Sequence, residues 1–369
     1  MSITEINKDF EIMIVGGGPA GISTWLHLNK YAPELASRAF LIEKTSYPRD
    51  KLCGGGIGGW SKYVLKSLNV NIDIPFLNIS DVEFIYEKDS YILHQKNSFQ
   101  IVQRKDFDNF FANTAINRGL IIHQNESFLD YSIKEKNLIV KTNLGKYKIK
   151  TLVGADGALS KVRKKMNLEN KTNLAPTLEI FLKNNPKYDN EHTEKKILID
   201  MSPINKGLQG YIWHVPSFKN KEPVIGHGLV DLRIYKNRPK VDLKKILKED
   251  LKKRNILVDK AKFKSHPIRW PSREDKFSKE NIILAGDAIG AEPAFGGGIH
   301  FALSYGEIAA KSIIDAYDNN DFSYLDYKDK INSHYAGKFM EKCSDISLKL
   351  YNNEIDPIKA AREVFTIKQ

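Results

Sequence analysis

The chain has 369 residues, a formal net charge of +12 and two cysteines, Cys53 and Cys343. This length exceeds what one compact core usually holds, so we expect two domains. The distant cysteines exclude a disulfide framework, and no stretch reaches the ~20 apolar residues of a membrane-spanning helix. We therefore expect a cytoplasmic protein in a reducing compartment.

The first glycine-rich segment follows an apolar run at residues 12–15 and precedes a helix-compatible stretch from Ile22. It predicts a strand, a tight turn and a helix, the geometry that holds a dinucleotide pyrophosphate at a helix N-terminus. Its glycines would permit the turn, the approach of the phosphates and the packing of the helix on the strand. The residues predicted to bind a cofactor here are Gly16, Gly18, Pro19, Ala20 and Gly21.

The next apolar run, residues 39–42, ends in an acid. Glu43 follows Gly21 by about 20 positions, the spacing at which a carboxylate accepts hydrogen bonds from a ribose in the dinucleotide fingerprint. We expect Glu43 and the adjacent Lys44 to contact the cofactor.

Two more glycine-rich segments follow apolar runs. The second, residues 154–157, contains Asp156; the third begins at Gly286 and Asp287, continues through Pro293 and ends in three glycines. Together with the first segment they indicate one long cofactor that crosses one site.

These motifs resemble those of the FAD-dependent oxidoreductases of the aromatic-hydroxylase fold. Within that fold, the Cys-Gly-Gly segment at 48–56 and the Tyr-x-Trp-x-Val-Pro segment at 211–216 resemble the geranylgeranyl reductase branch. The resemblance covers residues from about 10 to 318. It implies an α/β fold in which a Rossmann-like FAD-binding domain carries an inserted β-sheet substrate domain and a C-terminal helical segment.

The segments predict that the FAD-binding domain is built from separate pieces of the chain. Alternating residues predict strands at 196–200 and 224–230, inside the larger insertion. The expected pieces are 1–75, 98–175 and 280–318 for the FAD-binding domain, 76–97 and 176–279 for the substrate-binding domain, and 319–369 for the helical segment.

The resemblance also assigns roles around the cofactor. It places Glu43 at the adenosine ribose, Asp287 at the ribityl or pyrophosphate region, and Arg104 along the cofactor, with a surface guanidinium as the alternative for Arg104. Asp156 either ties a strand end to the cofactor or forms a structural ion pair with Arg163. The start of a helix would bring backbone N–H groups and a positive dipole end to the flavin. The residues of that helix start are Gly296, Gly297, Gly298 and Ile299.

Three residues are predicted to act in catalysis: Cys53, Tyr211 and Trp213. The glycines after Cys53 would let its thiol approach the flavin, although a small buried hydrophobe is an equal alternative. Tyr211 and Trp213, two apart on one predicted strand, would face the same side and line an apolar channel, or form a core pair. Glu292 and His300 flank the flavin-edge glycines and are weaker candidates for a proton donor. No metal site is predicted.

Positive charge is concentrated between Lys236 and Lys264. Residues 241–251 predict a helix with leucines and isoleucine on one face and lysines elsewhere. Such a helix could rest on an anionic membrane, giving a peripheral location, or pack its apolar face inward. Nucleic acid is not expected, because no recognition pattern accompanies the charge.

We expect an FAD-dependent reductase that saturates carbon–carbon double bonds of an isoprenoid or other apolar substrate by hydride transfer from reduced flavin. Since no second glycine fingerprint follows another strand, electrons would come from a transient NAD(P)H or a separate donor. The enzyme alternative is an FAD monooxygenase acting on an aromatic or lipid substrate. A halogenase ranks lower, because the cysteine segment lacks the acid and serine of that group. A non-enzymatic prenyl-binding escort protein is the alternative of another class.

Overall fold

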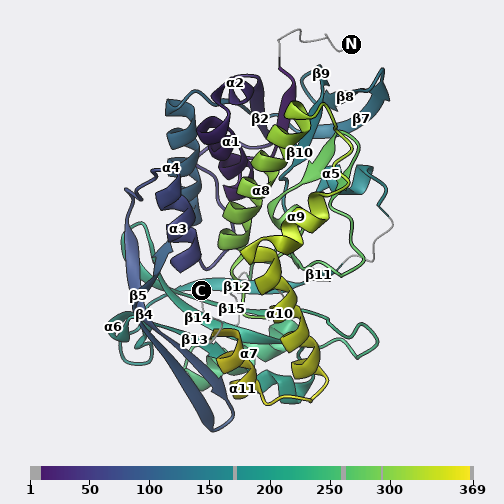
Figure 1. Cartoon of the computed structure of the whole chain (residues 1–369). Helices are drawn as coiled ribbons and strands as arrows, with labels where there is room; N and C mark the ends of the chain where they lie inside the picture. Colours follow the sequence, from purple (N-terminus) through teal and green to yellow (C-terminus); the bar gives the residue numbers. More distant parts are fainter. Residues whose placement is uncertain (1–9, 169–172, 259–262, 292–293, 366–369) are drawn as a thin grey trace.

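The computed structural model describes residues 10–168, 173–258, 263–291 and 294–365, and two large sheets dominate it (Figure 1). The first has six strands in the order β17, β18, β10, β1, β2, β6, and only β17 runs antiparallel to its neighbour. Its central strands are buried along their whole length, which explains why they are continuous apolar runs in the sequence. The strands are β1 Ile12–Val15, β2 Ala39–Glu43, β6 Ile121–Gln124, β10 Thr151–Gly154, β17 Ser278–Lys279 and β18 Ile282–Leu284.

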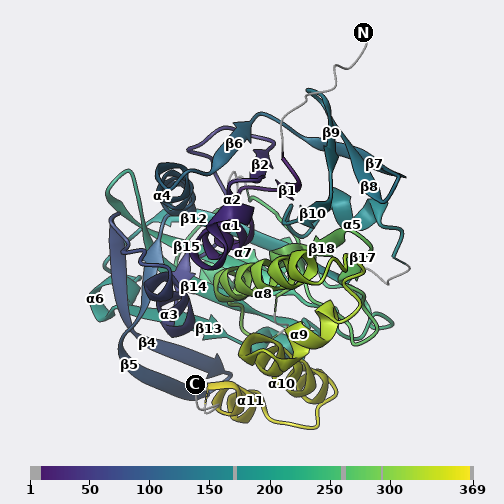
Figure 2. The same ribbon diagram turned by 45° about the horizontal axis from the view of Figure 1, so that its top comes forward.

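Helices and a small sheet flank the six-stranded sheet. Helix α1 packs against α4 and α8, and a three-stranded antiparallel sheet contacts β10 through β8. Figure 2 shows α8 lying beside α1. The helices are α1 Pro19–Tyr31, α2 Pro33–Ala36, α3 Gly59–Ser67, α4 Arg104–Asn117, α5 Lys161–Lys165 and α8 Gly298–Asp318, and the strands are β7 Phe128–Lys134, β8 Asn137–Thr142 and β9 Lys146–Ile149.

The second large sheet has seven strands in the order β12, β15, β14, β13, β4, β5, β3. Apart from the parallel pair β13 and β4, its strands are antiparallel. The strands are β3 Gly56–Ile57, β4 Phe76–Tyr86, β5 Asp89–Val102, β12 Thr177–Lys183, β13 Lys196–Asp200, β14 Gly210–Lys219 and β15 Glu222–Asp231.

Short elements and the C-terminal helices surround this second sheet. Helix α7 contacts β15, and α11 contacts β4 and β5 (Figure 1). The remaining elements are α6 Glu191–Glu194, α7 Leu243–Lys253, α9 Tyr327–Ser333, α10 Tyr335–Tyr351, α11 Pro357–Phe365, the 3-10 turns Ser202–Lys206 and Gly286–Ala288, and the paired strands β11 Leu174–Ala175 and β16 Ile268–Arg269.

The predicted α/β class, with a Rossmann-like parallel sheet and a separate β-sheet, is confirmed. The exact domain boundaries stay predictions. Strand β5 extends to Val102, beyond the expected limit at 97, and pairs with β3 at residues 56–57. The segment after Cys53 is therefore tied by backbone hydrogen bonds to the seven-stranded sheet.

The basic helix α7 buries Ile246, Leu247 and Leu251 against the protein. Of its two predicted arrangements, the structure thus shows the apolar face packed inward. Contact with an anionic membrane would depend on its lysines and stays a prediction. Within the described ranges, no helix is both long and apolar enough to cross a bilayer.

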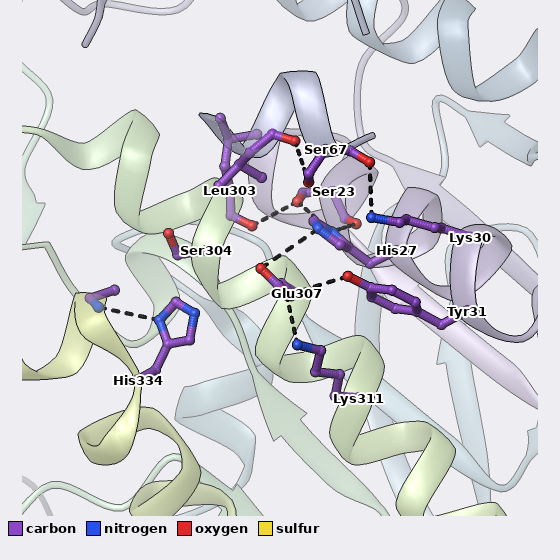
Figure 3. Close-up of polar contacts among 12 residues, drawn as sticks. Ser23, His27, Lys30, Tyr31, Ser67, Leu303, Ser304, Glu307, Lys311 and His334 are labelled. Atoms are coloured by element: carbon purple, nitrogen blue, oxygen red, sulfur yellow. Dashed lines mark hydrogen bonds and ion pairs between the residues drawn. The ribbon is translucent and has the colours of Figure 1, made fainter. Parts of the chain in front are cut away.

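Helices α1 and α8 approach each other closely where Gly306 faces Ser23. A Cβ atom on Gly306 would lie 2.5 Å from Ser23 Cβ and Oγ and 2.7 Å from the backbone nitrogen of Thr24. The Ser23 hydroxyl donates a 2.7 Å hydrogen bond to the carbonyl of Leu303, and the Glu307 carboxylate lies 3.9 Å from His27 (Figure 3). Because α1 begins at the first glycine segment and α8 at the third, this contact fixes two predicted cofactor-binding helix ends relative to each other.

We predict that Gly306→Ala lowers the free energy of unfolding by about 1–3 kcal/mol, even though alanine favours helix, because α1 and α8 would have to move apart. Chemical denaturation measures the effect. Asp318→Ala, at the exposed end of the same helix, is the control and should stay within about 0.5 kcal/mol of the wild type. Equal stability of the two variants would show that the helix contact is not tight.

Candidate active site

A cavity of about 2480 Å³ is lined by residues from both large sheets. One end lies at the carboxyl ends of β1 and β2, where the glycine segments gather. Strand β1 lies between β2 and β10, and the crevice at such a change of strand order is where open α/β sheets bind ligands. The other end is covered by the seven-stranded sheet.

The first glycine segment forms the predicted turn between β1 and α1. Gly16 has φ +106°, and a Cβ there would lie 2.4 Å from the carbonyl oxygen of Ala155. A Cβ on Gly21 would lie 2.0 Å from the carbonyl of Gly16, so only glycine lets the helix pack on the turn. By contrast, a Cβ on Gly18 would meet a single atom within 4 Å, on Arg49 at 3.7 Å. Gly18, Pro19 and Ala20 line the cavity, which leaves the start of α1 open to a phosphate.

Glu43 ends β2, is 5% exposed and lines the cavity. Its carboxylate accepts hydrogen bonds from the backbone of Gly17 at 2.8 Å and from the hydroxyl of Thr45 at 2.9 Å. Glu43 therefore couples the glycine turn to β2 at the place where a ribose is predicted to bind. Lys44 also lines the cavity and is exposed.

The third glycine segment leads into α8. Gly296 and Gly297 have φ of +88° and +123°, a region that favours glycine, and α8 begins at Gly298. The hydroxyl of Tyr211 lies 3.3 Å from where a Cβ on Gly296 would be, and Asp287 Oδ1 lies 3.7 Å from the corresponding point on Gly298. All of these residues and Ile299 line the cavity, so the predicted helix start faces the site.

Cys53 and Arg104 lie together in the cavity wall. The Arg104 side chain lies near the Cys53 side chain and donates two hydrogen bonds to Asp108, at 2.8 and 2.9 Å. Arg49 also pairs with Asp108, at 3.0 Å. Since Arg104 is only 8% exposed, the surface alternative for this residue does not hold. Whether it touches the cofactor stays a prediction.

Tyr211 and Trp213 project from the same face of β14 into the cavity, as predicted, with ring centroids 6.1 Å apart. Trp213 Nε1 donates a 3.3 Å hydrogen bond to Glu179 on β12. Their catalytic roles stay predictions. The wall around them is largely apolar and is formed by Val82, Phe84, Leu93, Phe99, Ile101, Ile197, Ile199, Val215 and Val230.

Known proteins share this architecture, although no protein-family model matches the chain. A digeranylgeranylglycerophospholipid reductase of Methanosarcina acetivorans is 27% identical over 363 residues, covering 92% of this chain and 83% of the relative. A geranylgeranyl bacteriochlorophyll reductase-like protein of Thermoplasma acidophilum superposes with a TM-score of 0.77 at 19% identity, covering 96% of this chain and 90% of that one. A flavin-dependent brominase superposes at 0.73 with 18% identity, covering 99% and 91%.

The chain has the geranylgeranyl reductase-like fold of FAD-dependent oxidoreductases. The likeness to the brominase shows that the same fold also occurs in halogenating enzymes. The fold-level resemblance stated from the motifs is confirmed.

The two weaker candidates for a proton donor are His300 and Glu292. His300 is enclosed by the rings of Trp60, Phe301 and Phe339, and burial lowers the pKa of His300 to about 3. It is therefore neutral near pH 7 and holds no extra proton to donate. Glu292, like Pro293 of the third motif, lies outside the described residues.

Asp156 lines the cavity but directs its carboxylate at the start of α5. It accepts hydrogen bonds from Ser160 Oγ at 2.5 Å and from the backbone of Lys161 at 2.6 Å. Arg163 lies 3.1 Å from Asp275 and also donates to the carbonyl of Ala288. These contacts give Asp156 a helix-capping role, and its cofactor role stays a prediction.

The ionisable cavity residues that were not among the predicted site residues include Lys51, Glu179 and His266. Burial lowers the pKa of Lys51, against the opposing effect of Asp287. Burial and then Lys51 lower the pKa of His266 to about 4. Burial raises the pKa of Glu179 to about 7. Only Lys51 had a signal, because it lies in the Cys-Gly-Gly segment.

We predict that Asp287→Ala weakens FAD binding by about 10-fold or more, because a carboxylate that faces the cavity beside α8 would be lost. The ratio of flavin absorbance to protein absorbance after purification, followed by titration with FAD, measures the loss. Asp89→Ala, on an exposed hairpin turn outside the cavity, is the control and should retain the cofactor. Stoichiometric FAD in Asp287→Ala would contradict the assigned role.

Proposed function

We propose that this oxidoreductase saturates carbon–carbon double bonds of an isoprenoid chain or a similarly apolar lipid, using bound FAD. The observation that carries the proposal is the apolar wall of the seven-stranded sheet, which faces the glycine segments across one cavity. Such a wall would bury the hydrocarbon of a lipid while leaving its reactive bond near the flavin-binding end. The reductase names of several relatives support the same substrate class.

An aromatic cluster lines the apolar end of the cavity. The ring centroid of Phe84 on β4 lies 5.1 Å from that of Phe295 and 5.2 Å from that of Phe365 on α11. All three residues line the cavity. The C-terminal helix thus forms part of the apolar wall, and we infer that the cluster orients and desolvates the hydrocarbon chain.

The residues of the polar end fit FAD. The open start of α1 would receive the pyrophosphate, Glu43 the adenosine ribose, and the start of α8 the flavin edge. Arg49, Lys51 and Arg104 add positive charge beside this path. When bound and reduced, FAD would supply a hydride. The chain would position the substrate, exclude water and supply protons. NAD(P)H, or a separate donor, would deliver the electrons.

Cys53 is the proposed residue at the reacting face. Its thiol is half-buried, accepts a hydrogen bond from the backbone N–H of Gly55 at 3.4 Å and lies near the guanidinium group of Arg104. The neighbouring Gly54 lies close to Val215 of the apolar wall, since a Cβ on Gly54 would be 3.6 Å from Val215 Cγ2. Cys53 therefore lies where the polar and apolar ends of the cavity meet.

We predict that Cys53→Ser retains FAD but slows lipid reduction by about 10-fold or more and alters the flavin spectrum. Cys343→Ser is the control, because Cys343 is buried in α10 outside the cavity. Single-turnover reduction and the visible spectrum of both variants measure the effect. Full turnover with an unchanged spectrum in Cys53→Ser would leave the thiol with a packing role only.

We predict that the anaerobically reduced protein is reoxidised by a geranylgeranyl lipid, with saturated product detected by mass spectrometry. Mixing with oxygen in the absence of lipid is the comparison. Reoxidation by oxygen through a hydroperoxide-like intermediate, with no turnover of lipid, would assign a monooxygenase or halogenase instead. A colourless purified protein that does not bind added FAD would support the non-enzymatic function of a prenyl-binding escort protein.

A further inference from the structure

Glu179 is a buried carboxyl group on the apolar wall. It lies on β12, is 1% exposed and lines the cavity. Among the described residues of the seven-stranded sheet that line the cavity, it is the single acid. A carboxyl group in such surroundings is expensive to bury unless it is neutral or hydrogen-bonded.

Two glycines on the intervening strand make space for this carboxyl group. In the sheet register, Glu179 on β12 is opposite Gly228 on β15, which is opposite Trp213 on β14. A Cβ on Gly228 would lie 2.3 Å from the Trp213 ring, and a Cβ on Gly226 would lie 3.3 Å from Glu179 Oε1. The missing side chains let the Trp213 indole lie across β15 and donate its 3.3 Å hydrogen bond to Glu179.

A short path of side chains connects this acid to the flavin-binding end. Glu179 contacts Trp213, whose ring neighbours that of Tyr211 at 6.1 Å. The Tyr211 hydroxyl in turn lies beside Gly296, at the loop before α8. Glu179 and Tyr211 thus line the same cavity on either side of Trp213, and proton transfer from Glu179 requires the reacting double bond to lie on the Glu179 side.

We propose that Glu179 is the proton donor for alkene reduction in this cavity, a role that rests on the proposed function. In the reaction, one alkene carbon receives a hydride from reduced FAD, and the other receives the carboxylic acid proton. The π bond is consumed and two C–H bonds form. Glu179 is left as a carboxylate and regains a proton from solvent.

The ionisation of Glu179 is compatible with this role. Burial raises its pKa to about 7, and the opposing effects of the Trp213 hydrogen bond and of Lys264 are smaller. Lys264 and Glu179 exchange two backbone hydrogen bonds. The residue opposite Glu179 on β15 is Gly228, which carries no charge. The acid form is thus populated near neutral pH, whereas an ordinary glutamic acid would have lost its proton.

The test compares reduction of a geranylgeranyl lipid by pre-reduced, FAD-loaded wild type and Glu179→Gln across the pH range. We expect the wild-type rate to fall as pH rises through about 7, because the acid loses its proton. Glu179→Gln should be slower by about 100-fold and lack this pH dependence, with little change in KM. Glu222→Gln, an exposed acid on β15, is the control and should match the wild type.

A second variant and a lipid-free measurement separate a chemical role from a structural one. Trp213→Phe removes the hydrogen bond that favours the carboxylate, so the falling limb should move to higher pH. Infrared spectra of the lipid-free protein should show a carboxylic acid band that titrates near pH 7 and is missing in Glu179→Gln.

Separate results would overturn the two proposals. If reduced wild-type protein does not transfer electrons to lipid, both the proposed function and the proton-donor role of Glu179 are wrong. If the wild type is active and Glu179→Gln reduces lipid equally fast, with the same fall in rate as pH rises, only the proton-donor role is wrong. A rise in KM without a change in kcat would also overturn it, because Glu179 would then only bind substrate.

Discussion

The close approach of β1 and β10 at their carboxyl ends is the constraint on which the site depends. Ala155 donates its backbone N–H to the carbonyl of Val15 at 2.8 Å, and Gly16 donates to Ile42 on the other side at 2.9 Å. These bonds hold the chain so tightly that a side chain on Gly16 would overlap Ala155. The turn, the start of α1 and the end of β2 are consequently set as one unit, with Glu43 as its carboxylate.

Glycines, which have no side chain, also permit other close contacts between parts of the structure. Gly306 lets α8 pack on α1, Gly296 leaves room for the Tyr211 hydroxyl, and Gly228 makes space for the Trp213 ring. The first two of these contacts join segments that are far apart in the sequence, and the third joins consecutive strands of one hairpin. A rigid arrangement of helix starts and sheet wall follows, and it is this arrangement that can hold a long ligand in one orientation.

The cavity divides its chemistry between two ends. Positive side chains, including Arg49, Lys51 and Arg104, lie near the glycine turn, where an anionic pyrophosphate would bind. The seven-stranded sheet presents a largely apolar wall, and Glu179 is the single acid among its described residues that line the cavity. Low polarity at that end both favours a lipid and raises the pKa of the acid, so one environment serves substrate binding and proton supply.

The sequence by itself determined the fold class, the glycine turn, Glu43 at the end of β2, and the start of α8, because each depends on local backbone geometry at glycines. Alternation also placed Tyr211 and Trp213 on one face of their strand. Glu179 could not be found in this way, because an acid in an alternating strand is most often exposed. Only the tertiary structure decided its burial, its bond to Trp213 and the pairing of Arg49 with Asp108, since these depend on which segments become neighbours.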